Sequence, residues 1–176
     1  MSITFLSEGQ SPSARLRVTT TTVHDKKQRH EPITCLTAYD YATARLVDEA
    51  GIDIILVGDT LAQVVLGYDT TLPVTLEEML HHTRAVRRAV KSALVVGDMP
   101  FGTYQGDAKE GVANAVRFVK EAGAEAIKLE GGDKRVDLRA QCLPCGGVVG
   151  PAADQDHRTR PLCPHQRDIL PFLPLA

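Results

Sequence analysis

The 176-residue sequence predicts an α/β protein built on a parallel sheet, and two observations indicate this fold class. Apolar runs typical of buried strands alternate with helical patterns from about residue 33 to residue 132, as in parallel βαβ units. Three successive strand candidates also end in an acid, which is Asp59, Asp98 or Glu130. The open doubly wound sheet and the closed (β/α)8 barrel both bind ligands at the carboxyl ends of their strands, and acids on consecutive ends favour the barrel.

No glycine-rich fingerprint follows the first strand candidate, which disfavours a nucleotide-binding doubly wound sheet. A complete barrel usually has about 250 residues, so this sequence is short for one. We therefore predict a fold of the parallel (β/α)8 TIM-barrel family, with about the first four βα units present and an irregular C-terminal tail.

The first elements are indicated by apolar runs and by residues that begin or end helices. A short strand over 33–39 precedes a helix over 41–50, which Asp40 can cap and Gly51 can end. The second strand, 54–59, is rich in β-branched residues and reads as fully buried. The connection over 60–75 is long for a βα loop, and such loops are usually lids or binding loops.

The remaining elements repeat this pattern. The next helix starts with a capping box, Thr75-Leu76-Glu77-Glu78, and a strand over 93–98 follows it. Asp107, with Glu110 three residues on, can begin another helix that stops at Gly123, before a last strand over 126–130. The apolar positions at helical spacing are Leu76, Met79, Leu80, Thr83 and Val86 in the first helix, and Val112, Ala115, Val116 and Val119 in the second.

The sequence divides into three parts by composition. We expect a flexible leader over 1–22, the N-terminal half of a (β/α)8 barrel over 23–136, and an irregular tail rich in proline and cysteine over 137–176. After Gly132 the chain holds six of its ten prolines and three of its four cysteines. Neither a helical nor a strand period continues there, because the apolar residues are interrupted by proline.

Charge and hydropathy exclude two classes of partner. The net charge of −2 gives no electrostatic reason to bind nucleic acid, and no apolar run is long enough to span a membrane. The N-terminus lacks the positive and apolar regions of a secretory signal, so we expect a cytoplasmic protein without a disulfide framework.

The three acids at the strand ends predict a metal site. Carboxylate oxygens are ligands suited to Mg²⁺, and three acids on one rim would repel one another unless a cation lay between them or one were protonated. The alternative is that each acid caps a helix or pairs with a neighbouring base. Lys128 shares the strand face of Glu130, so it is a candidate to bind a substrate carboxylate or phosphate.

Histidine and cysteine give weaker signals. We assign no catalytic or metal role to His81 or His82, since they lie on a helix away from the predicted rim. The tail offers a second metal candidate, because its Cys-x2-Cys pair and a later Cys-x-His pair could hold zinc, although the second spacing is unusual. Its residues are Cys142, Cys145, Cys163 and His165.

Six segments, read together, resemble one enzyme family. They occur in order between about residues 21 and 136. The segments are Leu36-Thr37-Ala38-Tyr39-Asp40-Tyr41, Val57-Gly58-Asp59-Thr60-Leu61, Leu66-Gly67-Tyr68-Asp69-Thr70-Thr71-Leu72-Pro73-Val74-Thr75, His81-His82-Thr83-Arg84-Ala85-Val86-Arg87-Arg88, Asp98-Met99-Pro100-Phe101-Gly102 and Lys128-Leu129-Glu130-Gly131-Gly132. Through all of them the chain resembles ketopantoate hydroxymethyltransferase.

The resemblance implies a (β/α)8 barrel that forms a homo-oligomer, binds Mg²⁺ and uses two small molecules. It would transfer a one-carbon unit from 5,10-methylenetetrahydrofolate to 3-methyl-2-oxobutanoate, giving 2-dehydropantoate in pantothenate biosynthesis. Asp59, Asp98 and Glu130 resemble the acids of the metal shell. The substrate-binding positions that the resemblance implies are Asp59, Thr60, Asp98 and Lys128.

Departures from the family leave rival interpretations open. Thr60 stands where the family usually has serine, and Gly97 stands where it often has alanine. Nothing beyond about Val136 resembles the family, so the glutamate that serves as its general base has no counterpart in this sequence. A change of reading frame near residues 135–140 would explain this switch. The rivals are an inactive fragment, a zinc-binding module in the tail, and a Mg²⁺-dependent keto-acid lyase, which the 67–75 loop disfavours.

Overall fold

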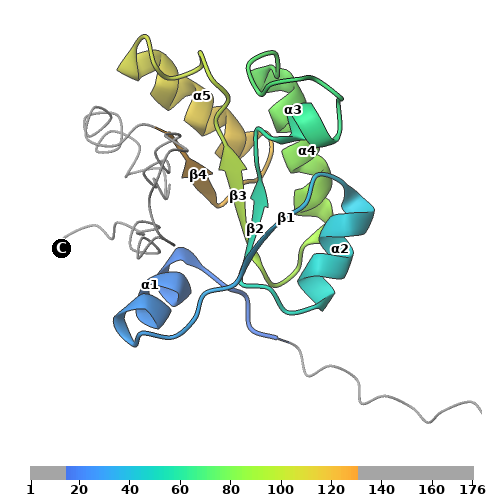
Figure 1. Ribbon diagram of the computed structural model, residues 1–176. Helices are drawn as coiled ribbons and strands as arrows, with labels where there is room; N and C mark the ends of the chain where they lie inside the picture. The colour runs from blue at the N-terminus through green and yellow to red at the C-terminus, as the bar shows by residue number, and fades with distance from the viewer. Residues whose placement is uncertain (1–14, 131–176) are drawn as a thin grey trace, which may run out of the picture.

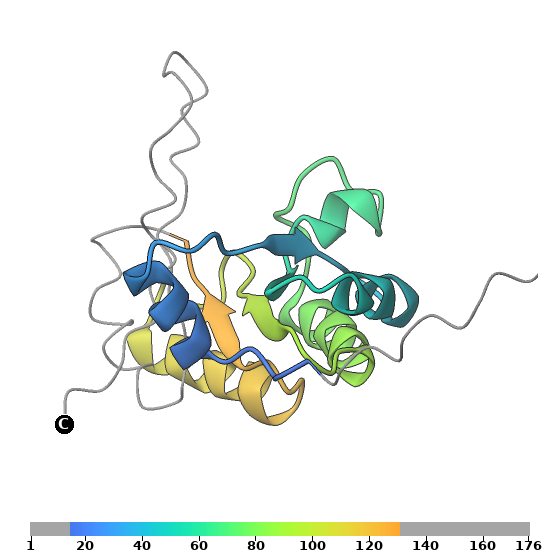
Figure 2. The ribbon, with the colours of Figure 1, turned by 90° about the horizontal axis from the view of Figure 1, so that it is seen from below.

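The computed structural model describes residues 15–130, which form a four-stranded parallel sheet with helices against its outer face (Figures 1 and 2). The strands lie in the order β1-β2-β3-β4, so each new strand is added on the same side of the last. A doubly wound sheet would reverse this order at a switch point, whereas a barrel keeps it. The strands are β1 Cys35–Thr37, β2 Ile54–Val57, β3 Leu94–Asp98 and β4 Ala126–Lys128.

The predicted helices form, and their caps explain where they begin. Asp40 accepts a hydrogen bond from the Thr43 amide at the start of α2, and the Thr75–Glu78 capping box starts α4. Asp107 caps α5, but it accepts from the amide of Lys109 and forms no reciprocal pair with Glu110. The helices are α1 Thr20–Gln28, α2 Tyr41–Glu49, α3 Leu61–Val64, α4 Leu76–Ala89 and α5 Ala108–Lys120.

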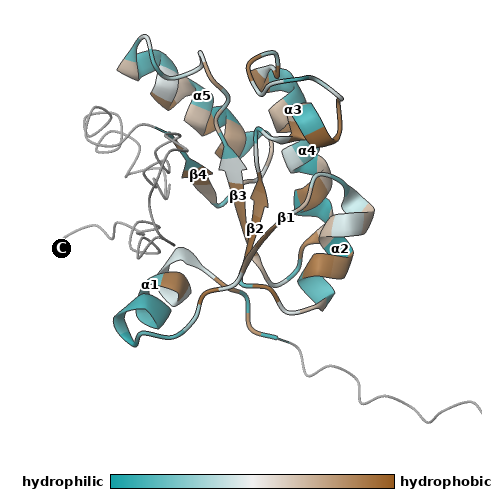
Figure 3. Cartoon of the chain, in the orientation of Figure 1, coloured by the Kyte–Doolittle hydropathy of each residue, from teal (hydrophilic) through white to brown (hydrophobic). Residues whose placement is uncertain are grey.

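The two faces of the sheet have different neighbours because side chains alternate along each strand. Ile55, Val95 and Ile127 pack in the cluster that includes the buried residues of the outer helices. Their neighbours along the strands pack on the opposite, inner face, where Val96 and Ala126 belong to a second cluster. Figure 3 shows the strands as the hydrophobic centre of the fold. Asp98 and Lys128 continue the inner-face positions toward the carboxyl end of the sheet.

Helix α1 lies at the amino ends of the strands, and the sequence did not predict it. Val23 of this helix is buried in the inner-face cluster with Val18, whose amide donates to the Ser92 carbonyl at 2.7 Å. The boundary of the predicted flexible leader, residue 22, therefore falls inside a helix that packs against the sheet. Because the whole of α1 contributes a single buried side chain, its sequence has no apolar period to reveal it.

Two further details differ from the expected pattern. The long connection after β2 begins with α3, whose Leu61 and Ala62 are buried, so this part of the predicted lid belongs to the core. Gly97 of β3 lies against the fully buried ring of Phe118, where an added Cβ would come within 2.5 Å of the ring.

The predicted tail, 137–176, lies outside the described residues. No helix between residues 15 and 130 has the length and apolar character to cross a membrane.

Candidate active site at the carboxyl ends of the strands

The centre of the candidate site is a lysine between two acids. Asp98 and Lys128 are direct neighbours across β3 and β4, and both lie on the inner-face register. The Lys128 ammonium donates to Asp98 Oδ2 at 2.8 Å and to Glu130 Oε1 at 3.1 Å. The strand register therefore accounts for the closer of the two ion pairs, because paired residues on one face are neighbours.

Asp98 is buried, with 2% of its surface exposed, and its two oxygens have different surroundings. Oδ2 accepts from Lys128, whereas Oδ1 has no hydrogen-bond partner within the described part of the chain. Burial raises the pKa of the Asp98 carboxyl to about 6; Lys128 opposes the shift and the charge of Asp59 adds to it. A buried acceptor without a donor is costly, so this oxygen is suited to a ligand that supplies positive charge.

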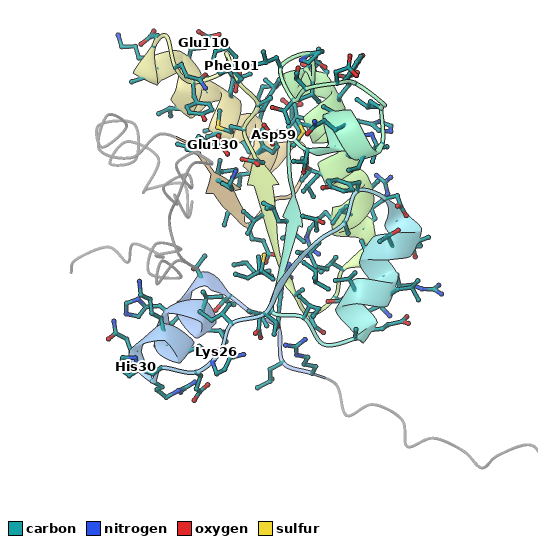
Figure 4. The ribbon with its side chains drawn as sticks, in the orientation of Figure 1. Lys26, His30, Asp59, Phe101, Glu110 and Glu130 are labelled. Atoms are coloured by element: carbon teal, nitrogen blue, oxygen red, sulfur yellow. The ribbon has the colours of Figure 1, made fainter. Side chains whose placement is uncertain are left out.

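Asp59 stands next to Asp98 at the end of β2. Its amide donates to Asp98 Oδ2 at 3.4 Å, and Figure 4 shows its side chain at the same end of the sheet as Glu130. Burial raises the pKa of the Asp59 carboxyl; Lys128 opposes this shift, Glu130 adds to it, and a hydrogen bond from Thr71 opposes it. The long loop after α3 thus reaches the rim through Thr71.

Lys128 keeps its charge in this cluster. Burial favours the neutral amine, but the pairs with Asp98 and Glu130 outweigh it and raise the pKa of Lys128. The lysine was expected to meet an anion of the substrate, and in the structure it meets two carboxylates of the chain itself. One ammonium does not balance the charge of three carboxylates, so this rim carries an excess of negative charge.

The predicted metal site of three acids is not gathered as one group in the structure. Across residues 15–130, no three His, Cys, Asp or Glu side chains are gathered closely enough to hold a metal ion. Mg²⁺ is commonly held by one or two carboxylates together with water. Asp98 Oδ1 is an acceptor without a partner in the described residues, whereas Asp98 Oδ2 and Glu130 Oε1 both accept from Lys128.

Two tyrosines reach the same rim, and the sequence did not single them out. The hydroxyl of Tyr39, beyond β1, lies 2.8 Å from the hydroxyl of Thr60, and His82 donates to the Tyr39 carbonyl at 2.7 Å. The Tyr104 hydroxyl lies against the backbone of Glu130. Tyr39 ends the strand predicted over 33–39 but was given no role there, and Tyr104 arrives from a loop, which a pattern of strand ends does not predict.

Comparison with known proteins identifies relatives over most of the chain. The family model described as ketopantoate hydroxymethyltransferase matches residues 17–149. The 3-methyl-2-oxobutanoate hydroxymethyltransferase of Koribacter versatilis is 59% identical over 82% of this chain and 50% of its own length, and that of Syntrophomonas wolfei is 55% identical over 81% and 53%. The chain thus spans about half the length of the curated relatives it matches.

Solved structures give the same fold at low sequence identity. The chain aligns with 2,3-dimethylmalate lyase, a member of the PEP mutase/isocitrate lyase superfamily, with a TM-score of 0.60 and 19% identity over 78% of this chain and 55% of the other. Phosphonopyruvate hydrolase, solved with oxalate and Mg²⁺, aligns with a TM-score of 0.57 and 16% identity over 75% and 52%. At these identities the likeness concerns the fold alone.

The family match corrects one boundary. We expected the resemblance to end near residue 136, but the family model continues to residue 149. Cys142 and Cys145 therefore belong to the matched part, whereas Cys163 and His165 lie beyond it. The proposed zinc residues are divided by this limit and all lie outside the described residues, so the zinc site stays a prediction.

Proposed function

Because this chain belongs to the ketopantoate hydroxymethyltransferase family, we propose that residues 15–130 supply the keto-acid and Mg²⁺ rim for hydroxymethyl transfer to 3-methyl-2-oxobutanoate. The proposed donor is 5,10-methylenetetrahydrofolate and the proposed product is 2-dehydropantoate. One observation carries the proposal, which is the buried Asp98 with an unpartnered oxygen beside Asp59 and Lys128. A buried carboxylate with one oxygen that lacks a donor is a group that a bound cation would satisfy.

We propose that Asp59 and Asp98 hold the Mg²⁺. When bound, the ion would polarise the keto group as a Lewis acid and make the adjacent C–H more acidic. Glu130, predicted from the sequence as a third ligand, is bonded to Lys128 in the structure, so its proposed part is to orient that lysine.

The chain's own residues have separate tasks in this proposal. Lys128 stays protonated and offsets the carboxylate charge of the keto acid. Thr60, whose hydroxyl is oriented by Tyr39, donates a hydrogen bond to the substrate. The described residues include no assigned general base, and such a base typically contributes 10²- to 10⁴-fold to a rate. Binding is therefore a more direct test of these residues than turnover.

The binding test compares the wild-type chain with Asp59→Ala. The melting temperature of the wild type should rise on addition of Mg²⁺ with 3-methyl-2-oxobutanoate, by the linkage between ligand binding and stability. Asp59→Ala should lose most of this rise, whereas Asp25→Ala, which changes an exposed acid on α1 at the other end of the sheet, should keep it. Equal responses of Asp59→Ala and the wild type would refute the assignment.

An activity assay separates the proposed function from its rival. Formation of 2-dehydropantoate that depends on the folate would establish transfer by this chain. Binding without product formation would instead support the rival interpretation, a catalytically inactive form that keeps the rim. We also propose a cytoplasmic location and, as the family resemblance implies, a homo-oligomer. Light scattering of the purified chain would measure its assembly.

A further inference from the structure

The Tyr104 hydroxyl makes two hydrogen bonds to one residue at the rim. Tyr104 lies in the connection between β3 and α5, and 3% of its surface is exposed. Its oxygen accepts from the Glu130 amide at 2.9 Å, and the hydroxyl donates to the Glu130 carbonyl at 3.3 Å. One hydroxyl thus satisfies both backbone polar groups of Glu130, as a neighbouring strand would do.

This contact takes over where the strand ladder stops. The β3–β4 pairing ends at Asp98 and Lys128, and the Met99 amide makes a last bond to the Lys128 carbonyl at 3.1 Å. β3 turns away after this point, into the loop that carries Tyr104. The side chain of Tyr104 returns from that loop to the backbone of Glu130 and so extends the pairing outward.

The loop that carries Tyr104 is itself tied at both ends. Thr103 Oγ1 donates to the Pro100 carbonyl at 2.7 Å near the end of β3, and Asn114 of α5 donates to the Thr103 carbonyl at 2.8 Å. Gln105 accepts from the Gly102 amide at 2.7 Å within the loop. A hydroxyl on such a braced segment has a defined position, and it can therefore fix the group it bonds.

We propose that Tyr104 is a positioning residue that holds Glu130 in place and, through Glu130, sets the Lys128 ammonium against Asp98. The proposal rests on the proposed function, because it assigns Tyr104 to the same keto-acid rim. Lys128 has a flexible stem and would otherwise be fixed through Asp98 alone. Groups that orient a binding residue typically change affinity or activity 10- to 100-fold when removed.

Tyr104→Phe tests this role because it keeps the ring and removes the hydroxyl. The first measurement needs no ligand: the rate at which a small amine-reactive reagent labels Lys128, followed by site-resolved mass spectrometry. The Lys128 side chain is 29% exposed, so the reagent can reach it. The variant should be labelled several-fold faster than the wild type, because a Lys128 side chain held less firmly by Glu130 and Asp98 more often presents its neutral amine, which is the reactive form, to the reagent. The second measurement is the affinity for Mg²⁺ with 3-methyl-2-oxobutanoate, which should weaken about tenfold.

Three further variants exclude a general loss of stability. Tyr41→Phe removes a hydroxyl from a half-exposed tyrosine on α2 and should change neither measurement. Val23→Ala lowers stability at the opposite end of the sheet and should leave Lys128 labelling unchanged in the folded protein. If Tyr104→Phe does not fold, Asn114→Ala loosens the same loop from α5 and should raise labelling in the same direction.

The outcomes distinguish this inference from the proposed function. Unchanged Lys128 labelling in folded Tyr104→Phe, or an equal increase in Val23→Ala, overturns the positioning role. A wild-type chain that binds neither Mg²⁺ nor the keto acid overturns the proposed function, and faster labelling of Tyr104→Phe would then still support the mechanical link from Tyr104 to Lys128. Faster labelling together with weaker binding supports both.

Discussion

Asp53 and Asp98 are both buried, both lie 2.8 Å from a lysine, and stand at opposite ends of the sheet. Asp53, at the amino end of β2, receives Lys26 on both oxygens, Arg15 on Oδ1, and the amide and hydroxyl of Thr34 on Oδ2. Asp98 receives Lys128 on one oxygen and has the other unpartnered within the described residues. Figure 4 shows Lys26 at the end of the molecule away from Asp59 and Glu130.

The protonation of the two aspartates follows from this difference. Burial acts to raise the pKa of Asp53, but the bonds from Lys26 and Thr34 outweigh it and hold that pKa below its ordinary value. At Asp98 burial prevails and the pKa rises to about 6. In barrels of this type the amino ends of the strands serve stability and the carboxyl ends serve activity. The fully bonded aspartate therefore fits a structural role, and the incompletely bonded one is the residue proposed above to bind a ligand.

Asp53→Asn should have the largest effect on stability. The amide removes the negative charge and leaves Lys26 and Arg15 facing a neutral group, so the free energy of unfolding at pH 7 should fall by about 3–4 kcal/mol. The folded pKa of Asp53 is depressed, so its contribution is present above the unfolded value of about 3.9 and is lost as pH falls through the folded pKa. Urea denaturation of both proteins from pH 7 downward measures the difference.

Asp25→Asn is the matched control, because it changes an exposed aspartate on α1, and it should alter stability by less than about 0.5 kcal/mol. If Asp53→Asn were equally mild, the bonds around Asp53 would contribute little, and the contrast between the two ends of the sheet would rest on geometry alone.

Asp98→Asn should act in the opposite direction. The folded pKa of about 6 lies above the unfolded value, so the contribution of the Asp98 carboxyl to stability is fully present below about pH 4 and is lost as pH rises to about 6. Asparagine does not ionise, and the variant should therefore be more stable than the wild type by about 1–3 kcal/mol at pH 7.5 and nearly equal at pH 4. Denaturation at the two pH values, without Mg²⁺, tests this sign; a loss at pH 7.5 would make Asp98 a structural residue like Asp53.

Sequence patterns located the rim at the carboxyl ends of the strands, but not the base of the sheet, which is the set of contacts around Asp53 at the amino ends. Asp59, Asp98 and Lys128 could be placed because strand ends are visible as apolar runs that stop at a polar residue, and parallel strands end at one edge. Asp53 bonds to Lys26, which is 27 positions away on a helix without an apolar period. It also bonds to Arg15, which is 38 positions away and outside any helix or strand. No local pattern records such contacts, since only the folded chain brings their members together.

The partners of the rim residues were also beyond the sequence. Glu130 was predicted as a metal acid from its place after a strand, but its bond to Lys128 and its backbone bonds to Tyr104 depend on how a loop returns to β4. Phe118 was omitted from the predicted apolar face of α5, although it is the fully buried residue that fills the space over Gly97. Position along a strand can be inferred from periodicity, whereas the choice of neighbour is set by packing.

Arg15→Met should have the smallest effect, and it tests whether the base of the sheet is redundantly paired. Arg15 donates to Asp53 Oδ1 and to the Ile52 carbonyl, both at 3.0 Å, but its side chain is 34% exposed and Lys26 contacts both oxygens of Asp53. A partly exposed ion pair contributes little, so the free energy of unfolding should fall by about 0.5–1 kcal/mol, measured by the same urea denaturation. Methionine keeps part of the apolar stem, so packing changes little. A loss as large as that of Asp53→Asn would mean that Arg15, rather than Lys26, keeps Asp53 charged, and the base would then depend on a single cation as the rim depends on Lys128.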